Sequence, residues 1–268
     1  MPMDVKDPAM DKGNGIECWL DEQELAASAS SEYWNDTMIE QGKDWWCEKG
    51  SDGSRLMDFL EQSGFLQQFR HLLQVGRREG LVQGHILDAA AGVCWTSALL
   101  SREPQVEQVE AMDFSRHRIE LIAPNIFELF RADPGKIRRV IGSFYHVARP
   151  DGFYDLIVLC QAFHHAEQPE LLLNECSRVL KPGGVLLLAC EPYIPLWRYA
   201  GKTVLTALKK GRIMNFSELY PADAVTGDQN YLSRDYRLML RMHGFNIVYF
   251  QKDCRHRMLG LFARKESG

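Results

Sequence analysis

Residues 85–95, with the sequence HILDAAAGVCW, decide how this chain folds. The segment begins as an apolar strand that ends at Asp88, continues with three alanines and Gly92, and then changes to a helical pattern. Small residues directly after a strand let a ligand approach the backbone closely. We therefore predict that a ligand lies against the turn between this strand and the following helix.

The chain after this turn alternates between strand and helix patterns. Strands are predicted in GHILDAA, VEQVEAMDFS, RRVIGSF, YDLIVLCQAFHH, VLLLAC, NIVYFQ and RMLGLFARK. Helices are predicted in VCWTSALLSR, SRHRIELIAPNIFELF, QPELLLNECSRVL and LSRDYRLMLRMHGF, the last of them capped by Ser233. This alternation indicates an α/β fold with a doubly wound, mostly parallel, seven-stranded sheet. The last two strands have no helix between them and predict a terminal antiparallel hairpin.

The sequence predicts three regions. Residues 1–15 are polar, lack the apolar core of a secretory signal, and are expected to be a disordered tail of a cytoplasmic protein. Residues 16–80 are expected to form an N-terminal helical region rich in aromatic side chains. Residues 81–268 hold the sheet domain, whose insertion at 191–230 is too long for a simple connection and predicts a lid or a segment that carries its own helix.

Composition narrows the class of protein. The chain has 268 residues, of which 46% are hydrophobic and 25% charged, as in soluble globular proteins. No apolar run reaches the roughly 18–20 residues of a membrane span. The net charge of −5 disfavours a nucleic-acid partner. The seven cysteines form no Cys-x-x-Cys motif, so neither a zinc site nor a disulfide framework is indicated. A homo-oligomer remains open.

The nature of the ligand follows from two aspartates. Asp113 ends the strand pattern after the quoted one, about 20 residues on, where an acid that binds ribose hydroxyls is expected. Nicotinamide enzymes need glycines in the first turn, but Ala90 and Cys94 stand at two of those places. The charge of Asp88 would also repel a pyrophosphate. A cationic nucleoside such as S-adenosylmethionine, which has no phosphate, suits this turn better.

Four segments together resemble the class I S-adenosylmethionine-dependent methyltransferases, most closely the group that acts on small molecules. They are LDAAAGVC, VEAMDFS, GFYDLIVLCQAFHHAEQPELLLNECSRVLKPGGVLLLACEP and LSRDYRLMLRMHGF. The resemblance covers about residues 84–262 and implies a Rossmann-like fold for the 81–268 domain. It also implies S-adenosylmethionine as the cofactor.

The resemblance implies a role for each matching position. The residues expected to border the methionine part of the cofactor are Asp88, Ala89, Ala90, Ala91 and Gly92. Asp113 is expected to bind the ribose, with Phe114 beside the adenine. Ser143 and Phe144 stand where relatives usually offer an acid to the adenine amine. Cys160 and Gln161 are expected to face the cofactor and the acceptor.

Methyl transfer is an in-line displacement, for which an enzyme mainly aligns the reactants. A hydroxyl acceptor must also lose a proton, so a base helps. His164 and His165 are the candidates, and since successive residues leaving a strand point in opposite directions, we favour His165. The alternative is that this histidine only hydrogen-bonds a loop. No metal is expected, because adjacent histidines do not easily share an ion and no third ligand is evident.

Two regions are expected to shape the acceptor site. Tyr33 and Trp34 in the N-terminal region, and Trp197 in the insertion, are predicted to contact the substrate. The insertion also carries Arg198, Lys202, Lys209, Lys210 and Arg212 with no acid between positions 193 and 217, which suggests an anionic acceptor. Packing of the aromatic residues and a solvated helix face are the alternatives.

The sequence thus favours an enzyme that methylates a hydroxyl or amine of a small molecule, such as a sugar, a natural product or another metabolite. Two alternatives remain. One is a methyltransferase of RNA or protein. The other is a non-catalytic relative that serves as a partner subunit, for which the replaced glycines are the support.

Overall fold

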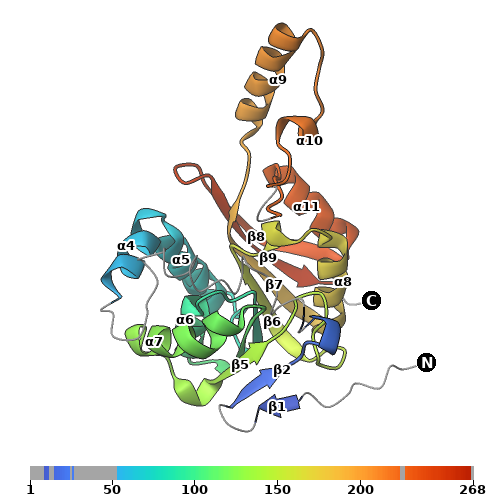
Figure 1. Cartoon of the computed structure of the whole chain (residues 1–268). Helices are drawn as coiled ribbons and strands as arrows, with labels where there is room; N and C mark the ends of the chain where they lie inside the picture. The colour runs from blue at the N-terminus through green and yellow to red at the C-terminus, as the bar shows by residue number, and fades with distance from the viewer. Residues whose placement is uncertain (1–8, 12–14, 25, 27–52, 224–226, 267–268) are drawn as a thin grey trace, which may run out of the picture.

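The computed structural model describes residues 9–11, 15–24, 26, 53–223 and 227–266. In these residues nine strands form one sheet in the order β1-β2-β5-β4-β3-β6-β7-β9-β8 (Figure 1). The strands are β1 (Ala9–Asp11), β2 (Ile16–Cys18), β3 (Gly84–Ala89), β4 (Val106–Asp113), β5 (Ile137–Ile141), β6 (Tyr154–Cys160), β7 (Leu180–Pro192), β8 (Phe245–Asp253) and β9 (Met258–Lys265). Pairing is parallel from β2 to β7 and antiparallel for β1 with β2 and for β9 with β7 and β8. The predicted α/β fold with a terminal hairpin is confirmed.

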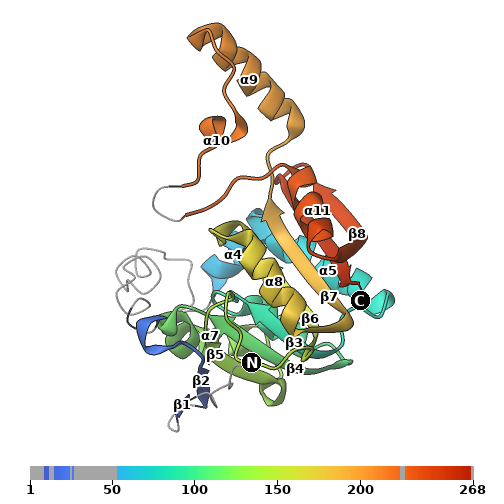
Figure 2. The same cartoon turned by 90° about the vertical axis from the view of Figure 1, so that its right-hand side faces the viewer.

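Helices cover both faces of the sheet. One face is covered by α4 (Ser54–Gln62), α5 (Phe65–Arg78), α6 (Trp95–Ser101) and α7 (Ala123–Leu129), which follows a π-helical turn at Arg118–Ile122. The other face is covered by α8 (Pro169–Val179) and α11 (Ser233–Met242) (Figures 1 and 2). Because both faces are covered, neighbouring residues of one strand, such as Ile86 and Leu87 in β3, are both buried.

The sheet has two strands more than the seven expected, and both come from the N-terminal residues. Residues 16–18, which we expected to be helical, form β2 and pair in parallel with β5. Residues 9–11, expected in a disordered tail, form β1 and pair with β2. Without β2, the edge of β5 would leave a row of unpaired backbone groups, which an added strand satisfies. Ile16 and Trp19 are buried in the process.

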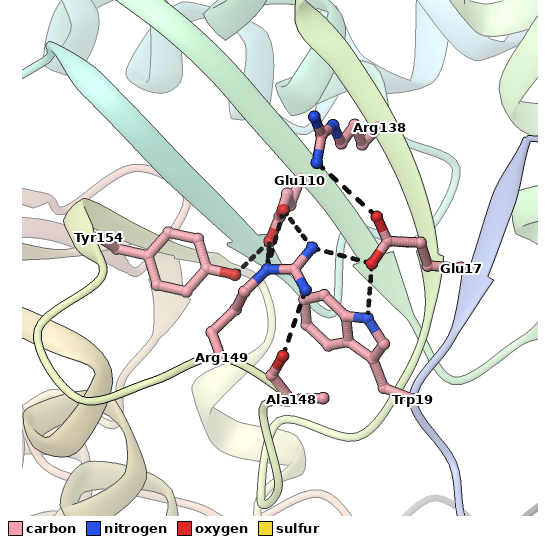
Figure 3. A network of polar contacts seen from close by, with 7 residues as sticks. All are labelled: Glu17, Trp19, Glu110, Arg138, Ala148, Arg149 and Tyr154. Atoms are coloured by element: carbon pink, nitrogen blue, oxygen red, sulfur yellow. Dashed lines mark hydrogen bonds and ion pairs between the residues drawn. The ribbon is translucent and has the colours of Figure 1, made fainter. Parts of the chain in front are cut away.

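A buried ion network joins this N-terminal strand to the sheet (Figure 3). Nη2 of Arg149, in the loop before β6, donates to Glu17 Oε2 at 2.8 Å and to Glu110 Oε1 at 2.6 Å. The hydroxyl of Tyr154 donates to Glu110, and Nε1 of Trp19 donates to Glu17 at 3.0 Å. Although burial alone would raise the pKa of Glu17, these hydrogen bonds and the charge of Arg149 lower it. The network explains why a three-residue strand holds its place.

One predicted cap is wrong. Ser233 is the first residue of α11, and the N-cap position belongs to Leu232, whose N–H donates to Asp235 Oδ2 at 2.8 Å. The Asp235 carboxylate, in the first turn of the helix, therefore accepts the hydrogen bond of the N-cap N–H group.

The insertion at 191–230 forms its own helices. α9 (Leu196–Lys210) and α10 (Phe216–Leu219) project away from the sheet, beyond the end of β7 (Figures 1 and 2). Among the described residues no helix is long and apolar enough to cross a membrane.

Candidate active site

A pocket of about 750 Å³ opens at the carboxyl ends of β3, β4 and β6. This is the edge of an open parallel sheet where ligands bind, and the volume suits a small-molecule site. One wall is apolar and consists of Leu56, Phe59, Leu60, Phe65 and Trp95 from α4, α5 and α6. The lining also contains polar and charged side chains from other segments, among them Asp113, Arg118, Gln161, His165 and Glu167.

The turn after β3 has an unusual backbone. Ala90, Gly92 and Cys94 have φ values of 53°, 58° and 66°, all in the left-handed region. Ala91 N donates to Met112 O at 2.8 Å and thereby joins the turn to β4. Ala90, Ala91 and Gly92 line the pocket. The turn thus keeps a glycine-type conformation at two positions where the sequence has other residues, and each of them stores backbone strain.

Asp88 and Ala89 do not line the pocket, contrary to our expectation that both border the cofactor. The Asp88 carboxylate is buried beneath the turn, where Oδ2 accepts hydrogen bonds from Thr96 and Ser97 at the start of α6. Burial raises the pKa of Asp88 to about 6, against the two hydroxyl donors. Its side chain therefore organises the helix start rather than the pocket surface, because the strand alternates its side chains between the two faces of the sheet.

Asp113 does line the pocket, at the end of β4. Its Oδ2 accepts from Gly92 N at 2.7 Å and its Oδ1 from Ser115 N at 2.8 Å. Burial raises the pKa of Asp113, while the charge of Arg118 and these two N–H donors oppose the increase. The carboxylate is thereby held in one orientation and joins the two strand ends that we expected to grip the cofactor.

Aromatic and small residues form the next part of the lining. Phe114, Ser143, Phe144 and Tyr145 all border the pocket, and the rings of Phe144 and Tyr145 meet edge to face with centroids 4.7 Å apart. A Cβ at Gly142 would lie 2.9 Å from Met112 Sδ, so a larger residue there would require the Met112 side chain to shift. Phe114, Ser143 and Phe144 were expected here, whereas Tyr145 was not.

The two histidines lie side by side on a 3-10 turn, Phe163–His165, with ring centroids 4.2 Å apart, so the expectation that they leave a strand in opposite directions is wrong. His165 lines the pocket, while His164 is buried and is not part of the lining. Nδ1 of His165 lies 2.6 Å from Asp228 Oδ1. Desolvation and the neighbouring His164 lower the pKa of His165, and Asp228 counteracts this only in part. A neutral imidazole with Nδ1 bonded to a carboxylate leaves Nε2 able to accept a proton.

Glu191 holds the loop that carries both histidines. Its carboxylate is fully buried at the end of β7, where Oε1 accepts from the N–H groups of Ala162 and Phe163 at 2.8 and 2.9 Å. Oε2 accepts from His164 N and lies 2.9 Å from His164 Nδ1. Burial opposes protonation of His164, but the charge of Glu191 outweighs it and raises the His164 pKa.

A third possible metal ligand lies beside the two histidines. We expected no third ligand near the histidines, but Asp228 supplies a carboxylate, and the ligand atoms of His164, His165 and Asp228 lie within 4.8 Å of one another. Both Nδ1 atoms are already hydrogen-bonded to carboxylates. The absence of a bound metal therefore stays a prediction.

Cys160 and Gln161 line the pocket at the end of β6. Gln161 has a φ of 54°, its N–H donates to Ala189 O at 3.0 Å, and its side chain donates to Cys190 O. These two bonds tie the turn to β7. Desolvation raises the pKa of the Cys160 thiol well above its ordinary value, so it is protonated at neutral pH and is a poor nucleophile.

Of the expected substrate residues, the structure describes only Trp197. Trp197 is 75% exposed on α9 and is not part of the lining. Tyr33 and Trp34 lie outside the described residues. The residues that we missed are Arg118, Tyr145 and Glu167 in the lining, the apolar wall from α4 and α5, and the two acids that hold the histidines, Glu191 and Asp228. An acid at the end of the apolar VLLLAC strand was the one available signal for Glu191.

Comparison with known proteins agrees with this geometry. Residues 87–188 match the family model described as "Methyltransferase domain". The demethylmenaquinone methyltransferase of Lactiplantibacillus plantarum is 27% identical over 178 residues, which are 63% of this chain and 73% of that protein. The enzyme of the same name from Listeria monocytogenes is 28% identical over 119 residues, 42% of this chain and 48% of that protein. The chain thus spans about half the length of the Listeria relative.

Solved structures share the fold. The magnesium protoporphyrin IX methyltransferase of Synechocystis PCC 6803, with bound SAH, superposes with a TM-score of 0.60 at 17% identity, covering 90% of this chain and all of that one. A putative methyltransferase from Bacillus halodurans gives a TM-score of 0.56 at 18% identity over 75% of this chain and 99% of its own.

The sheet order, the pocket at its carboxyl edge and the match of residues 87–188 define a class I S-adenosylmethionine-dependent methyltransferase. The protein is an enzyme of this class, and its methyl donor is S-adenosylmethionine. The prediction of class, activity and cofactor is confirmed.

Proposed function

We propose that this enzyme methylates a hydroxyl or amine of a small molecule whose body is largely apolar. The observation that carries the proposal is one pocket lined both by Asp113 and by the apolar side chains of α4 and α5. His165 stands in the same lining. The names of two similar proteins, a demethylmenaquinone and a magnesium protoporphyrin IX methyltransferase, point to acceptors of the same apolar kind.

The lining residues at the carboxyl ends of the strands fit S-adenosylmethionine. The Asp113 carboxylate suits two ribose hydroxyls, which are hydrogen-bond donors. A Cβ at Gly92 would have only Arg118 Nη1 within 4 Å, at 3.8 Å, so the turn leaves open space beside its backbone. Phe114 and Phe144 offer ring surfaces for the adenine. S-adenosylmethionine carries no phosphate group, so a carboxylate at this turn does not repel it.

When bound, S-adenosylmethionine supplies a methyl group on a positively charged sulfur. The protein's contribution is alignment, exclusion of water and movement of one proton. Nε2 of His165 accepts the proton of an acceptor hydroxyl, while Nδ1 keeps its hydrogen bond to Asp228. Aligning the reactants contributes about 7–11 kcal/mol to such reactions, and a base contributes about 10²–10⁴-fold.

Calorimetry tests the cofactor side of the proposal. We expect wild type to bind S-adenosylmethionine and S-adenosylhomocysteine, and Asp113→Ala to weaken both markedly. Glu107→Gln is the matched control, because Glu107 lies on the same strand with its side chain 74% exposed. Its affinity is expected to equal that of wild type. If wild type produces neither heat nor a thermal shift, the chain is a non-catalytic relative and the proposal fails.

Mass spectrometry of products tests the acceptor side. The enzyme is incubated with S-adenosylmethionine and panels of quinones, porphyrins, phenols, amines and sugars, with RNA and protein panels alongside. A mass increase of one methylene in an apolar small molecule supports the proposal. Methylation confined to RNA or protein contradicts it and favours the macromolecular alternative.

A further inference from the structure

Helix α9 projects away from the sheet (Figures 1 and 2). Its large apolar side chains are exposed. None of its residues is buried. Trp197, Val204 and Leu208 are 75%, 60% and 79% exposed, and their spacing places them on one side of the helix. This stripe extends over roughly 16 Å at 1.5 Å per residue. Leu196, Leu205 and Ile213 add further exposed apolar surface beside it.

The opposite side of α9 is already used within the protein. The rings of Tyr199 and Phe216 meet edge to face with centroids 5.3 Å apart. Nζ of Lys202 lies 4.1 Å from the ring centroid of Tyr220 and donates to Leu219 O. α10 therefore packs on one face of α9, and the apolar stripe is a different face that the described residues leave open.

The charge of residues 193–217 is opposite to that of the rest of the chain, which we call the body. Residues 193–217 contain five lysines and arginines and no acid, whereas the whole chain carries a net −5, so the remaining residues carry a net −10. Arg212 pairs with Glu218 at 2.8 Å. Arg198, Lys209 and Lys210 are exposed on α9 itself. A partner attracted to this helix is thus anionic, and it is repelled by the rest of the protein.

We propose that α9 docks on the surface of an anionic lipid bilayer. An exposed apolar stripe flanked by cations is the pattern of a helix that lies in the membrane interface. Trp197 suits the headgroup region, and cations near an anionic leaflet each strengthen binding roughly fivefold. The acidic body restricts docking to this helix. Because α9 follows β7 at the edge that holds the pocket, docking brings the active site toward the bilayer. The proposal does not depend on the proposed acceptor.

Co-sedimentation of the full chain with vesicles tests this surface. We expect wild type to sediment with vesicles of phosphatidylcholine and phosphatidylglycerol and to remain in solution with phosphatidylcholine alone. Trp197→Ser combined with Leu208→Ser is expected to abolish binding. Lys209→Gln combined with Lys210→Gln is expected to weaken it about 25-fold, and high salt is expected to have a similar effect on wild type.

The matched control is Leu238→Ser combined with Met242→Ser on α11, because these side chains are likewise 59% and 74% exposed. We expect this variant to bind as wild type does. Since α9 has no buried residue, its variants should melt like wild type, which separates lost binding from unfolding. Wild type that ignores anionic vesicles, or α9 variants that bind unchanged, would overturn the proposal. Sedimentation velocity gives a further test. If wild type is a dimer and the Trp197 and Leu208 substitutions dissociate it, the stripe is a contact between two copies of the chain, and the proposal is overturned.

Discussion

His165 and Asp228 are 63 positions apart in the sequence, yet their side chains are joined by a hydrogen bond of 2.6 Å between Nδ1 and Oδ1. The histidine follows β6 in the sheet, and the aspartate comes from the end of the insertion. The bond thus connects the peripheral segment to the proposed base and makes the insertion part of the active site.

This pair yields the first prediction. His165→Ala should leave cofactor affinity unchanged and lower kcat by about 10²–10⁴-fold for a hydroxyl acceptor. Asp228→Asn should lower kcat less and barely change KM, since it disturbs only the orientation of the ring. Because Asp228 raises the pKa of His165, the same substitution should move the acidic limb of the kcat profile to lower pH.

Steady-state kinetics at several pH values measure both effects. His243→Ala serves as a control, since that histidine contacts Asn174, away from the pocket. Normal turnover of His165→Ala would show that the ring only supports its loop.

The second prediction concerns Glu191. Glu191→Ala should cost about 3–5 kcal/mol of unfolding free energy, because the buried N–H groups of residues 162–164 lose their acceptor. Glu191→Gln should cost less and lower the pKa of His164, which Glu191 now raises. Urea unfolding and NMR titration of the His164 ring measure the two quantities. Glu79→Ala, at an exposed ion pair, should change stability by at most about 1 kcal/mol.

The turn after β3 gives the third prediction. Ala90 adopts a left-handed φ of 53°, which costs an L-residue about 1–2 kcal/mol. Ala90→Gly removes this strain but makes the unfolded chain more flexible, so we expect a net gain of about 0.5–1 kcal/mol. Ala98→Gly, in the middle of α6, should destabilise by a similar amount or more. Urea denaturation of the two variants should give shifts of opposite sign, and a loss of stability in Ala90→Gly would contradict the strain argument.

Asp88 gives the fourth prediction. Burial raises its pKa from 3.8 to about 6, so the folded state holds this proton more tightly than the unfolded state. The resulting stabilisation is complete below about pH 4 and is lost as the pH rises through 6, a change of about 3 kcal/mol. Asp88→Asn cannot titrate. Relative to wild type, its stability should therefore rise by up to about 3 kcal/mol between pH 4 and 7 and then stay level.

Urea unfolding at a series of pH values measures how the difference in unfolding free energy between Asp88→Asn and wild type changes with pH. Both hydroxyl donors bind Oδ2, so the asparagine oxygen can keep them, and any other cost of the amide is independent of pH. Asp151→Asn, with a side chain 83% exposed, should show no such slope. A constant difference between Asp88→Asn and wild type would mean that Asp88 is ionised throughout.

Much of the secondary structure can be predicted from local sequence patterns. The strand patterns from Gly84–Ala89 to Met258–Lys265 predicted seven strands of the sheet. The clearest of them, such as Tyr154–Cys160, are nearly apolar throughout because both faces of the sheet are covered there. The strand period also predicted that the two histidines point in opposite directions, and this was wrong because Phe163–His165 form a 3-10 turn on which the two rings lie 4.2 Å apart, although only His165 lines the pocket. The β3 turn was readable because its small residues are contiguous.

The sequence by itself thus determined the fold class, the cofactor and the edge of the sheet that holds the site. Only the tertiary structure decided that Asp88 lies beneath the pocket, that Glu191 and Asp228 hold the histidines, that α4 and α5 form the apolar wall, and that residues 16–18 extend the sheet. Strands and helices follow from the spacing of apolar residues over a few positions, and this spacing is visible in the sequence. A hydrogen bond between His165 and Asp228 instead depends on how distant segments pack, and no local pattern records that.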